Sequence, residues 1–235
     1  MELMRNIGAF IFLFLPFISL SQDENLLPIK NVDSLYREDQ FYFGLTYNIM
    51  AEAPSGYSAI GLSGGLQAGF LRDMPINERR NLALALGLGF AYDQFGQNLF
   101  VGEDPSGNSI YRVLDGSVDY SENKFKMAMV EVPLEFRWRT STATDYKFWR
   151  IYAGARIGYA YWYKSTFRQE NNTVVQSDIP EFNPLRLSAT LSMGYSTFNF
   201  FASYSLNPFF DNAVTEDGQK MDVKALKVGL MFYIL

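Results

Sequence analysis

The sequence predicts an all-β protein whose fold is an eight-stranded antiparallel up-and-down transmembrane β-barrel. Eight segments, most of them about 9–13 residues long, alternate apolar and polar side chains, which is the pattern and length of a strand that crosses a membrane. After the N-terminus no segment approaches the ~18 consecutive apolar residues of a spanning helix, although 48% of the chain is hydrophobic. The connections between the segments alternate between short and long, as they do in outer-membrane barrels.

The N-terminus predicts an exported protein. Arg5 precedes an apolar run at residues 7–18, and Ser19-Leu20-Ser21 then offers a small-x-small cleavage site. Residues 1–21 are therefore predicted to be a secretory signal peptide, the alternative being a short N-terminal core helix. Residues 22–39 are polar and irregular and are predicted to form a periplasmic lead-in, which leaves residues 40–235 as the barrel domain.

The first three predicted strands are residues 41–49, 60–70 and 82–93. In FYFGLTYNI, large apolar side chains occupy every second position. In IGLSGGLQAGF, isoleucine, leucine and phenylalanine share one face, and glycine, serine and glutamine share the other. In LALALGLGFAYD, large apolar residues alternate with alanine and glycine. Each segment predicts a strand with one apolar face.

The fourth predicted strand, residues 130–139, is VEVPLEFRWR. Every second residue from Val130 onward is apolar, and glutamates and arginines fill most of the positions between them. Pro133 interrupts this pattern, because proline has no N–H to donate to a ladder and a closed barrel has no edge strand to accommodate it. We therefore expect a local β-bulge at Pro133.

The last four predicted strands are residues 148–163, 184–196, 198–206 and 224–235. All four continue the alternation, and arginines occupy polar-face positions in the first two. An even number of strands brings the two ends of the barrel domain to the same side of the membrane. Because short turns face the periplasm in outer-membrane barrels, we expect a bacterial outer-membrane protein with both termini in the periplasm.

Alternation alone would also fit a secreted β-sandwich or a lipocalin-like barrel. Two features favour lipid on the apolar face. The polar face of residues 82–93 is mostly alanine and glycine, which suits a crowded barrel interior. Aromatic residues gather near the strand ends, where girdles at the two membrane interfaces would lie. The apolar residues of 130–139 are therefore predicted to face lipid, and the charged residues to face the interior.

The composition excludes several classes of function. A net charge of −5 argues against nucleic acid, whose phosphates require clustered lysine and arginine. The chain has no cysteine and no histidine, so no disulfide, no thiol chemistry and no histidine-assisted catalysis is available. Glu131 and Glu135 lie about 13 Å apart along a strand, which is too far for a glycosidase pair. We predict no catalytic residues, no cofactor and no metal site.

Charged residues on the polar face predict a network inside the barrel. A hairpin turning near Ala143 would place Glu131 opposite Arg156 and Glu135 diagonal to Arg150. An eight-stranded barrel is just wide enough for side chains to fill it, which favours a hydrogen-bonded plug over a charged pore or binding site. The predicted network consists of Asp93, Glu131, Glu135, Arg137, Arg150, Arg156 and Arg186.

The longest connection, residues 96–123, is predicted to be a surface loop. Glu103, Asp104 and Asp119 could supply oxygen ligands to calcium, but their spacing matches no EF-hand. Four apolar residues that we expect to be exposed in the loop form a candidate partner patch, the alternative being an ordinary solvated loop. These residues are Phe100, Ile110, Tyr111 and Leu114.

Six segments carry a resemblance to a known family. They are residues 33–48 (DSLYREDQFYFGLTYN), 79–93 (RRNLALALGLGFAYD), 126–142 (KMAMVEVPLEFRWRTST), 147–159 (KFWRIYAGARIGY), 203–210 (SYSLNPFF) and 226–235 (LKVGLMFYIL). The chain resembles the PorT-like, porin-family small outer-membrane β-barrel proteins of Bacteroidota. The resemblance covers nearly the whole mature chain and implies a role in type IX protein secretion, an outer-membrane export machine.

The C-terminus resembles the signal by which outer-membrane barrels are recognised for assembly. Lys227, Gly229, Phe232 and Ile234 match its polar-x-Gly-x-x-hydrophobic-x-hydrophobic pattern. The chain departs from the pattern at its last residue, Leu235, where many barrels end in phenylalanine.

The leading functional hypothesis is a non-catalytic barrel that is an accessory or scaffold of an outer-membrane machine such as type IX secretion. Its expected partners are outer-membrane lipid and other outer-membrane or periplasmic proteins. One alternative is a narrow porin-like pore for small solutes or ions, in which charge removal at Arg156 or Glu131 changes conductance. The other is a surface adhesin or structural barrel, in which deleting the tip of the loop 100–120 abolishes adhesion and leaves secretion intact.

Overall fold

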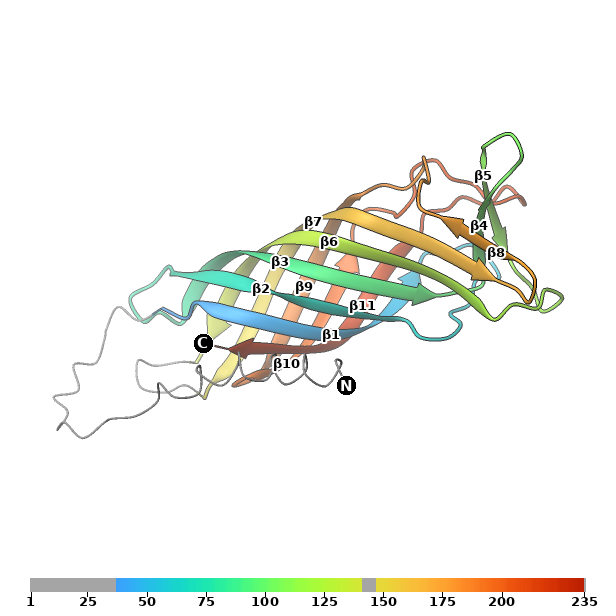
Figure 1. The fold of residues 1–235 in the computed structure, drawn as a ribbon. Coiled ribbons are helices and arrows are strands. Elements are labelled where there is room, and N and C mark those ends of the chain that lie inside the picture. The colour runs from blue at the N-terminus through green and yellow to red at the C-terminus, as the bar shows by residue number, and fades with distance from the viewer. Residues whose placement is uncertain (1–36, 141–146, 235) are drawn as a thin grey trace, which may run out of the picture. The chain divides into compact units, whose positions relative to one another are not determined.

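A computed structural model describes residues 37–140 and 147–234 of the chain. The described residues form a closed antiparallel barrel with a cap of longer connections at one end (Figure 1). Within them, no helix is long and apolar enough to cross a membrane. The predicted signal peptide, residues 1–21, and most of the predicted lead-in lie outside the described residues.

Eight strands close the barrel, which confirms the predicted fold class. Each strand pairs antiparallel with the next barrel strand along the chain, and β1 pairs with β11 to complete the ring. The barrel strands are β1 (Gln40–Ala51), β2 (Gly64–Pro75), β3 (Leu82–Gly96), β6 (Glu122–Arg139), β7 (Trp149–Arg168), β9 (Leu185–Tyr195), β10 (Phe198–Ser205) and β11 (Lys224–Ile234).

Three shorter strands lie in the long connections. β4 (Leu99–Glu103) and β5 (Ser109–Val113) pair as a hairpin in a separate two-stranded sheet. β8 (Thr173–Gln176) pairs with the distal end of β7. The prediction that residues 96–123 form a plain surface loop was therefore wrong. Each strand of the hairpin has only five residues, which is too short to show clear alternation in the sequence.

The two ends of the barrel differ as predicted. The short-turn end carries the connections 76–81, 140–148 and 196–197, together with the first residue of β1 and the last residue of β11. The long-loop end carries the connections 52–63, 97–121, 169–184 and 206–223. In Figure 1 the short-turn end is on the left, and β4, β5 and β8 gather on the right.

Inward and outward side chains alternate along the barrel wall. On β3, Leu84, Leu86 and Leu88 are 40–55% exposed, whereas Ala83 and Ala85 between them are fully buried. On β6, Leu134 and Phe136 face outward and Glu135 faces inward. A wall of exposed leucine and phenylalanine around a buried charged interior is the arrangement of a barrel in lipid.

Pro133 does not produce the expected bulge. The β3–β6 pairing is interrupted beside Pro133 but resumes in the same register, with Leu86 opposite Leu134 and Gly89 opposite Glu131. The barrel therefore loses ladder contacts at the proline, which cannot donate an N–H, without inserting an extra residue. The register irregularity in β6 lies instead between Ala128 and Met129, in its pairing with β7.

The first half of β6 escaped prediction because its polarity is reversed. Over residues 124–129 the inward side chains are apolar, with Phe125 and Met127 only 1% exposed, and the outward side chains include Lys124 and Lys126. The strand thus continues into a region where the barrel has an apolar interior and a basic exterior. Because the inward face changes from apolar to charged within this one strand, the start of the strand is hard to recognise in the sequence.

Candidate functional site

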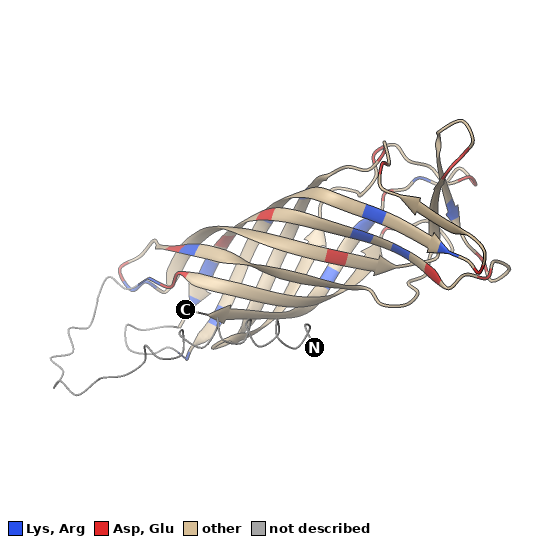
Figure 2. Ribbon diagram, in the orientation of Figure 1, with Lys and Arg blue, Asp and Glu red and all other residues tan. Residues whose placement is uncertain are grey.

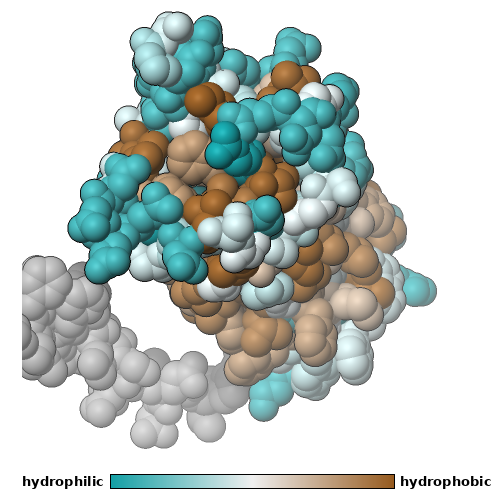
Figure 3. All heavy atoms as spheres, turned by 90° about the vertical axis from the view of Figure 1, so that its right-hand side faces the viewer, coloured by the Kyte–Doolittle hydropathy of each residue, from teal (hydrophilic) through white to brown (hydrophobic). Residues whose placement is uncertain are grey.

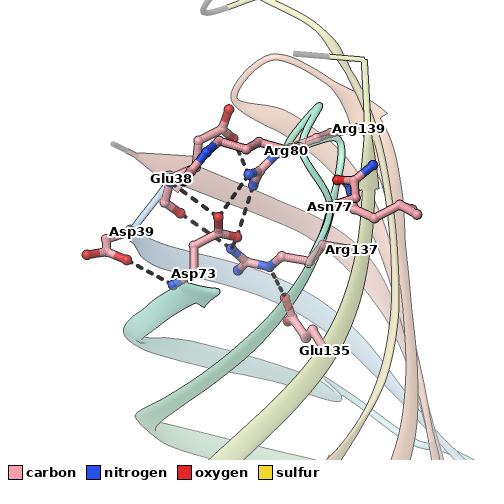
Figure 4. Close-up of polar contacts among 9 residues, drawn as sticks. Glu38, Asp39, Asp73, Asn77, Arg80, Glu135, Arg137 and Arg139 are labelled. Carbon is pink, nitrogen blue, oxygen red and sulfur yellow. Dashed lines mark hydrogen bonds and ion pairs between the residues drawn. The ribbon is translucent and has the colours of Figure 1, made fainter. Parts of the chain in front are cut away.

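The charged network inside the barrel begins with a cluster at the short-turn end. The Asp73 carboxylate lies between two arginines (Figure 4). The two terminal nitrogens of Arg139 each donate a hydrogen bond to one Asp73 oxygen, both at 2.9 Å. Arg137 Nη1 lies 3.2 Å from Asp73 Oδ1. Arg137 Nε donates to Glu135 at 3.1 Å. None of these side chains is more than 4% exposed, so this is a fully desolvated ion-pair cluster.

The residues just before β1 are tied into this cluster. The Glu38 carboxylate lies 3.5 Å from Arg139, and the Glu38 N–H donates to Asp73 Oδ2 at 3.4 Å. The Asp39 carboxylate accepts the Asp73 N–H at 2.8 Å. The chain is therefore held at the short-turn mouth before it enters the barrel wall.

The second cluster lies midway along the lumen. Arg156 Nη1 donates to Glu131 Oε2 at 3.1 Å and to Gln67 Oε1. The guanidinium also lies over two rings, 5.2 Å from the Tyr42 centroid and 4.9 Å from the Phe201 centroid. These partners come from four different strands, so the Arg156 side chain fills the lumen.

The predicted β6–β7 register was wrong by two residues. Glu131 is opposite Gly158, and Arg156 is opposite Pro133. Glu131 and Arg156 still meet because long side chains reach diagonal neighbours on the same face. Glu135, which was expected diagonal to Arg150, is opposite Gly154 and contacts Arg137 on its own strand.

The third cluster lies nearer the long-loop end. Asp93 accepts hydrogen bonds from Lys227 Nζ and, at 2.9 Å, from Asn48 Nδ2. Asp93 is on β3 and Lys227 on β11, so the ion pair spans the interior rather than joining adjacent strands. Five of the seven predicted network residues thus fall into three separate clusters along the barrel axis.

Arg150 and Arg186 belong to none of the three clusters. Among the residues that the structure describes, neither forms an ion pair with a carboxylate, although both are at most 4% exposed. Arg150 lies 4.4 Å over the Phe148 ring, and Arg186 lies 4.6 Å over the Phe209 ring. An aromatic face takes the place of a counter-ion for Arg150. For Arg186 an aromatic face does so together with the carbonyl oxygens of Asn183 and Phe209, to which it donates hydrogen bonds.

Aromatic side chains close the lumen at the long-loop end. We call the group Phe95, Phe125, Phe182, Phe209 and Phe210 the aromatic seal. Its members are 0–6% exposed, and their ring centroids lie 5.4–6.4 Å apart in the contacting pairs. Seen from this end, hydrophobic residues lie among hydrophilic loops (Figure 3). Charges below the aromatic seal are therefore shielded from this side.

The predicted partner patch does not exist in the expected form. Tyr111 is 2% exposed and Leu114 is 7% exposed, while Phe100 and Ile110 are half-buried. Tyr111 packs on Phe210, with ring centroids 5.4 Å apart. The hairpin β4–β5 buries its apolar residues against the cap, which the sequence alone could not reveal. Its polar tip remains available for contacts.

A carboxylate in the cap gives a pH-dependent contact. Glu181 accepts hydrogen bonds from Ser109 Oγ at 2.6 Å and from Tyr111 Oη at 2.9 Å. Burial tends to raise the pKa of Glu181, but these two donors lower it below its ordinary value of 4.5. A lowered folded-state pKa means that the contact stabilises the cap above about pH 4.5 and is lost as the pH falls further.

We expect the hairpin β4–β5 to become more sensitive to proteolysis below pH 4.5, because protonated Glu181 holds Ser109 and Tyr111 less strongly. An acid-stable protease at several pH values measures this. Glu181→Gln removes the titration and should give cleavage that no longer depends on pH in this range. Unchanged pH dependence in that variant would assign the effect to another group.

The assembly-signal residues occupy both faces of β11. Lys227 and Gly229 face the interior, and Phe232 and Ile234 face outward. Phe232 packs on Phe198, with ring centroids 5.2 Å apart. Their role in assembly stays a prediction.

Among the described residues, no three acidic side chains are grouped as metal ligands would be. Asp104, one of the residues considered for calcium, instead accepts hydrogen bonds from the N–H groups of Ser106 and Asn108 at 2.8 and 2.9 Å. Hydrogen bonds from Asn108 lower the pKa of Asp104. The hydrogen bonds to this carboxylate also hold the turn of the hairpin.

Sequence reasoning missed three residues of the cluster at the short-turn mouth. Glu38 belongs to the polar lead-in, Asp73 follows the predicted end of its strand, and Arg139 was assigned to the interior without a partner. Extending the second predicted strand by three residues would have placed Asp73 on the same face as Gln67.

Residues 20–211 match the family described as "Outer membrane protein beta-barrel domain". The chain belongs to this family. It is therefore an outer-membrane β-barrel protein, as its closed ring of lipid-facing strands requires. No curated protein matches the chain.

Two solved structures similar to this outer-membrane barrel protein are of one protein, Ail, the attachment invasion locus protein of Yersinia pestis. The first has 17% identity and a TM-score of 0.39, and covers 84% of this chain and 97% of Ail. The second, in complex with the heparin analogue sucrose octasulfate, has 17% identity and a TM-score of 0.40, and covers 83% of this chain and 96% of Ail.

Proposed function

We propose that this protein is a non-conducting, non-catalytic barrel that serves as an accessory or scaffold for other proteins of the outer membrane. The observation that carries this proposal is the filled interior. Apart from Asp39 at the mouth, every ion-paired side chain in the three clusters is at most 10% exposed, and the aromatic seal lies above them. A barrel without an open lumen acts through its outer surfaces, namely its wall, its cap and its short-turn mouth.

The cap supports a docking role. β4, β5 and β8 give the long connections regular structure, and Arg112 on β5 pairs with Glu216 of another connection. Pre-ordered loops bind with a smaller entropic cost than flexible ones. In the proposed orientation the cap faces outward and both termini face the periplasm, as in barrels with short periplasmic turns.

The PorT-like resemblance points to type IX protein secretion as the machine. The test is the native size of the full-length protein in mild detergent extracts of outer membranes, with co-purifying proteins identified by mass spectrometry. A stable large complex containing secretion components is the expected result. A lone barrel of its own mass plus detergent would contradict the accessory role.

The filled interior predicts no pore activity. We expect the purified protein in planar bilayers to show no stepwise conductance, because buried ion pairs and the aromatic seal leave no path for ions. Arg156→Ala should lower stability without opening a channel. The porin-like alternative would be favoured instead if the wild type showed steady conductance and if Arg156→Ala changed that conductance.

The adhesin alternative rests on the same cap. The hairpin β4–β5 reaches away from the barrel axis, where it could contact another surface (Figure 1). Deleting residues 104–108 at its tip leaves both strands in place and should abolish adhesion only if the protein is an adhesin. Loss of co-purifying secretion proteins in the same deletion would favour the accessory role.

A further inference from the structure

A row of cations lies on the outside of the barrel near the long-loop end. Lys126 on β6 is directly opposite Lys164 on β7, and both face outward. Lys124 lies two residues further along β6 on the same face. Figure 2 shows these as a group of blue segments on β6 and β7 toward the right-hand end.

This arrangement is unfavourable in the protein alone. Like charges directly opposite each other on a sheet destabilise the pairing. Glu122 offsets part of the charge, because it pairs with Lys124 and lies 3.4 Å from Arg168. Lys126 and Lys164 form no ion pair within the described part of the chain. An anion bound between these two lysines would remove the repulsion.

The residues beside the lysines belong at a membrane interface. In the next outward row, Tyr92 and Trp162 flank Ala128 and stack with ring centroids 6.4 Å apart. Tyrosine and tryptophan prefer the headgroup level of a bilayer. The paired lysines therefore lie where lipid phosphates lie, one row closer to the cap.

An apolar groove adjoins the row on the neighbouring strands. It has a volume of about 340 Å³ and lies where the outward-facing Gly64 provides no side chain. Leu45, Leu62 and Leu66 line it, and Tyr92 and Gln94 connect it to the lysine row. Gln94 is directly opposite Lys126, so the groove opens beside the cations.

We propose that Lys126 and Lys164 bind the phosphate of a phosphorylated glycolipid of the outer leaflet, and that the groove receives one of its acyl chains. The charge complementarity and the adjacent groove together favour a lipid over a protein partner. The assignment to the outer leaflet rests on the proposed orientation, with the long loops outside. Lipid bound here would also fix the barrel's depth in the membrane.

The test measures lipid retained by the purified full-length protein in native mass spectrometry. The probes are diphosphoryl lipid A, its dephosphorylated form and phosphatidylglycerol. We expect selective retention of diphosphoryl lipid A. The Lys126→Gln/Lys164→Gln variant should bind it about thirtyfold more weakly, because each lysine beside an anionic lipid contributes about a factor of five.

A matched control variant removes two positive charges at positions outside the lysine row. Lys147→Gln/Lys220→Gln removes two exposed lysines outside the row and should retain lipid A like the wild type. Leu66→Trp fills the groove from the lipid-facing side and should also weaken retention. This third variant keeps the test informative if the double lysine variant fails to fold.

Equal retention by the lysine variant and its control would overturn the proposal. So would equal binding of dephosphorylated lipid A, or displacement of lipid A by inorganic phosphate alone, since that would leave the groove without a role. Phosphatidylglycerol bound as tightly as lipid A would overturn the choice of a glycolipid. These outcomes are independent of co-purifying proteins, so failure here and failure of the accessory role remain distinguishable.

Discussion

Asp73→Asn is expected to lower the free energy of unfolding by about 3–5 kcal/mol, because it leaves two buried arginines without their shared carboxylate. Arg137 and Arg139 are both fully buried, and the carboxylates that remain beside them are Glu135 and Glu38. The change should also loosen the residues before β1, since the Glu38 N–H donates to Asp73. Unfolding by urea in lipid vesicles, followed by tryptophan fluorescence, measures the loss.

The control for Asp73 is an exposed carboxylate in the cap. Asp222 pairs with Lys220 at 2.6 Å, with side chains 41% and 70% exposed. Asp222→Asn should change stability by less than about 1 kcal/mol, because water screens the pair. If both variants lose the same stability, the buried cluster at the short-turn end is not a major stabilising element.

Gly229→Ala is expected to destabilise the seam between the first and last strands by about 1–3 kcal/mol. A Cβ at this position would meet the Leu45 carbonyl oxygen and would lie 2.7 Å from Thr46 Cα. Both are backbone atoms of β1, so one strand must shift along its ladder. The folded fraction, read from the heat-dependent mobility of the barrel in gel electrophoresis, should fall.

Gly116 tests whether this effect is steric. A Cβ added at Gly116 would have nothing within 4 Å. Gly116→Ala should therefore fold nearly as well as the wild type. If Gly229→Ala folds normally in vesicles but assembles poorly in cells, the residue acts in assembly recognition rather than in packing.

Alternation was sufficient to predict the barrel, because a strand with lipid on one side and a filled lumen on the other separates apolar from polar residues. The leucine-alanine-glycine pattern of 82–93 corresponds closely to β3. The same alternation correctly predicted that Arg150, Arg156 and Arg186 face the interior. Alternation does not determine the register between two strands. The contact between Glu131 and Arg156 was therefore predicted from a β6–β7 register that was wrong by two residues.

The remaining errors have local causes. Glu38 and Asp73 lie beyond the alternating segments, and their pairing with the arginines depends on barrel closure. Tyr111 and Leu114 are buried because long connections that are distant in the sequence pack together in the cap. Lys126 was hidden because the start of β6 exchanges its polar and apolar faces, and Lys164 lies just beyond the predicted strand 148–163, which continues to Arg168 in the structure.

The seam between β1 and β11 sets the order in which the molecule can fold. Eleven residue pairs join these two strands, from Phe41 opposite Ile234 to Ala51 opposite Lys224. During synthesis β1 emerges before β11, so one edge of β1 has no partner until β11 has been made. We expect closure of the ring to be the slow, committing step of folding.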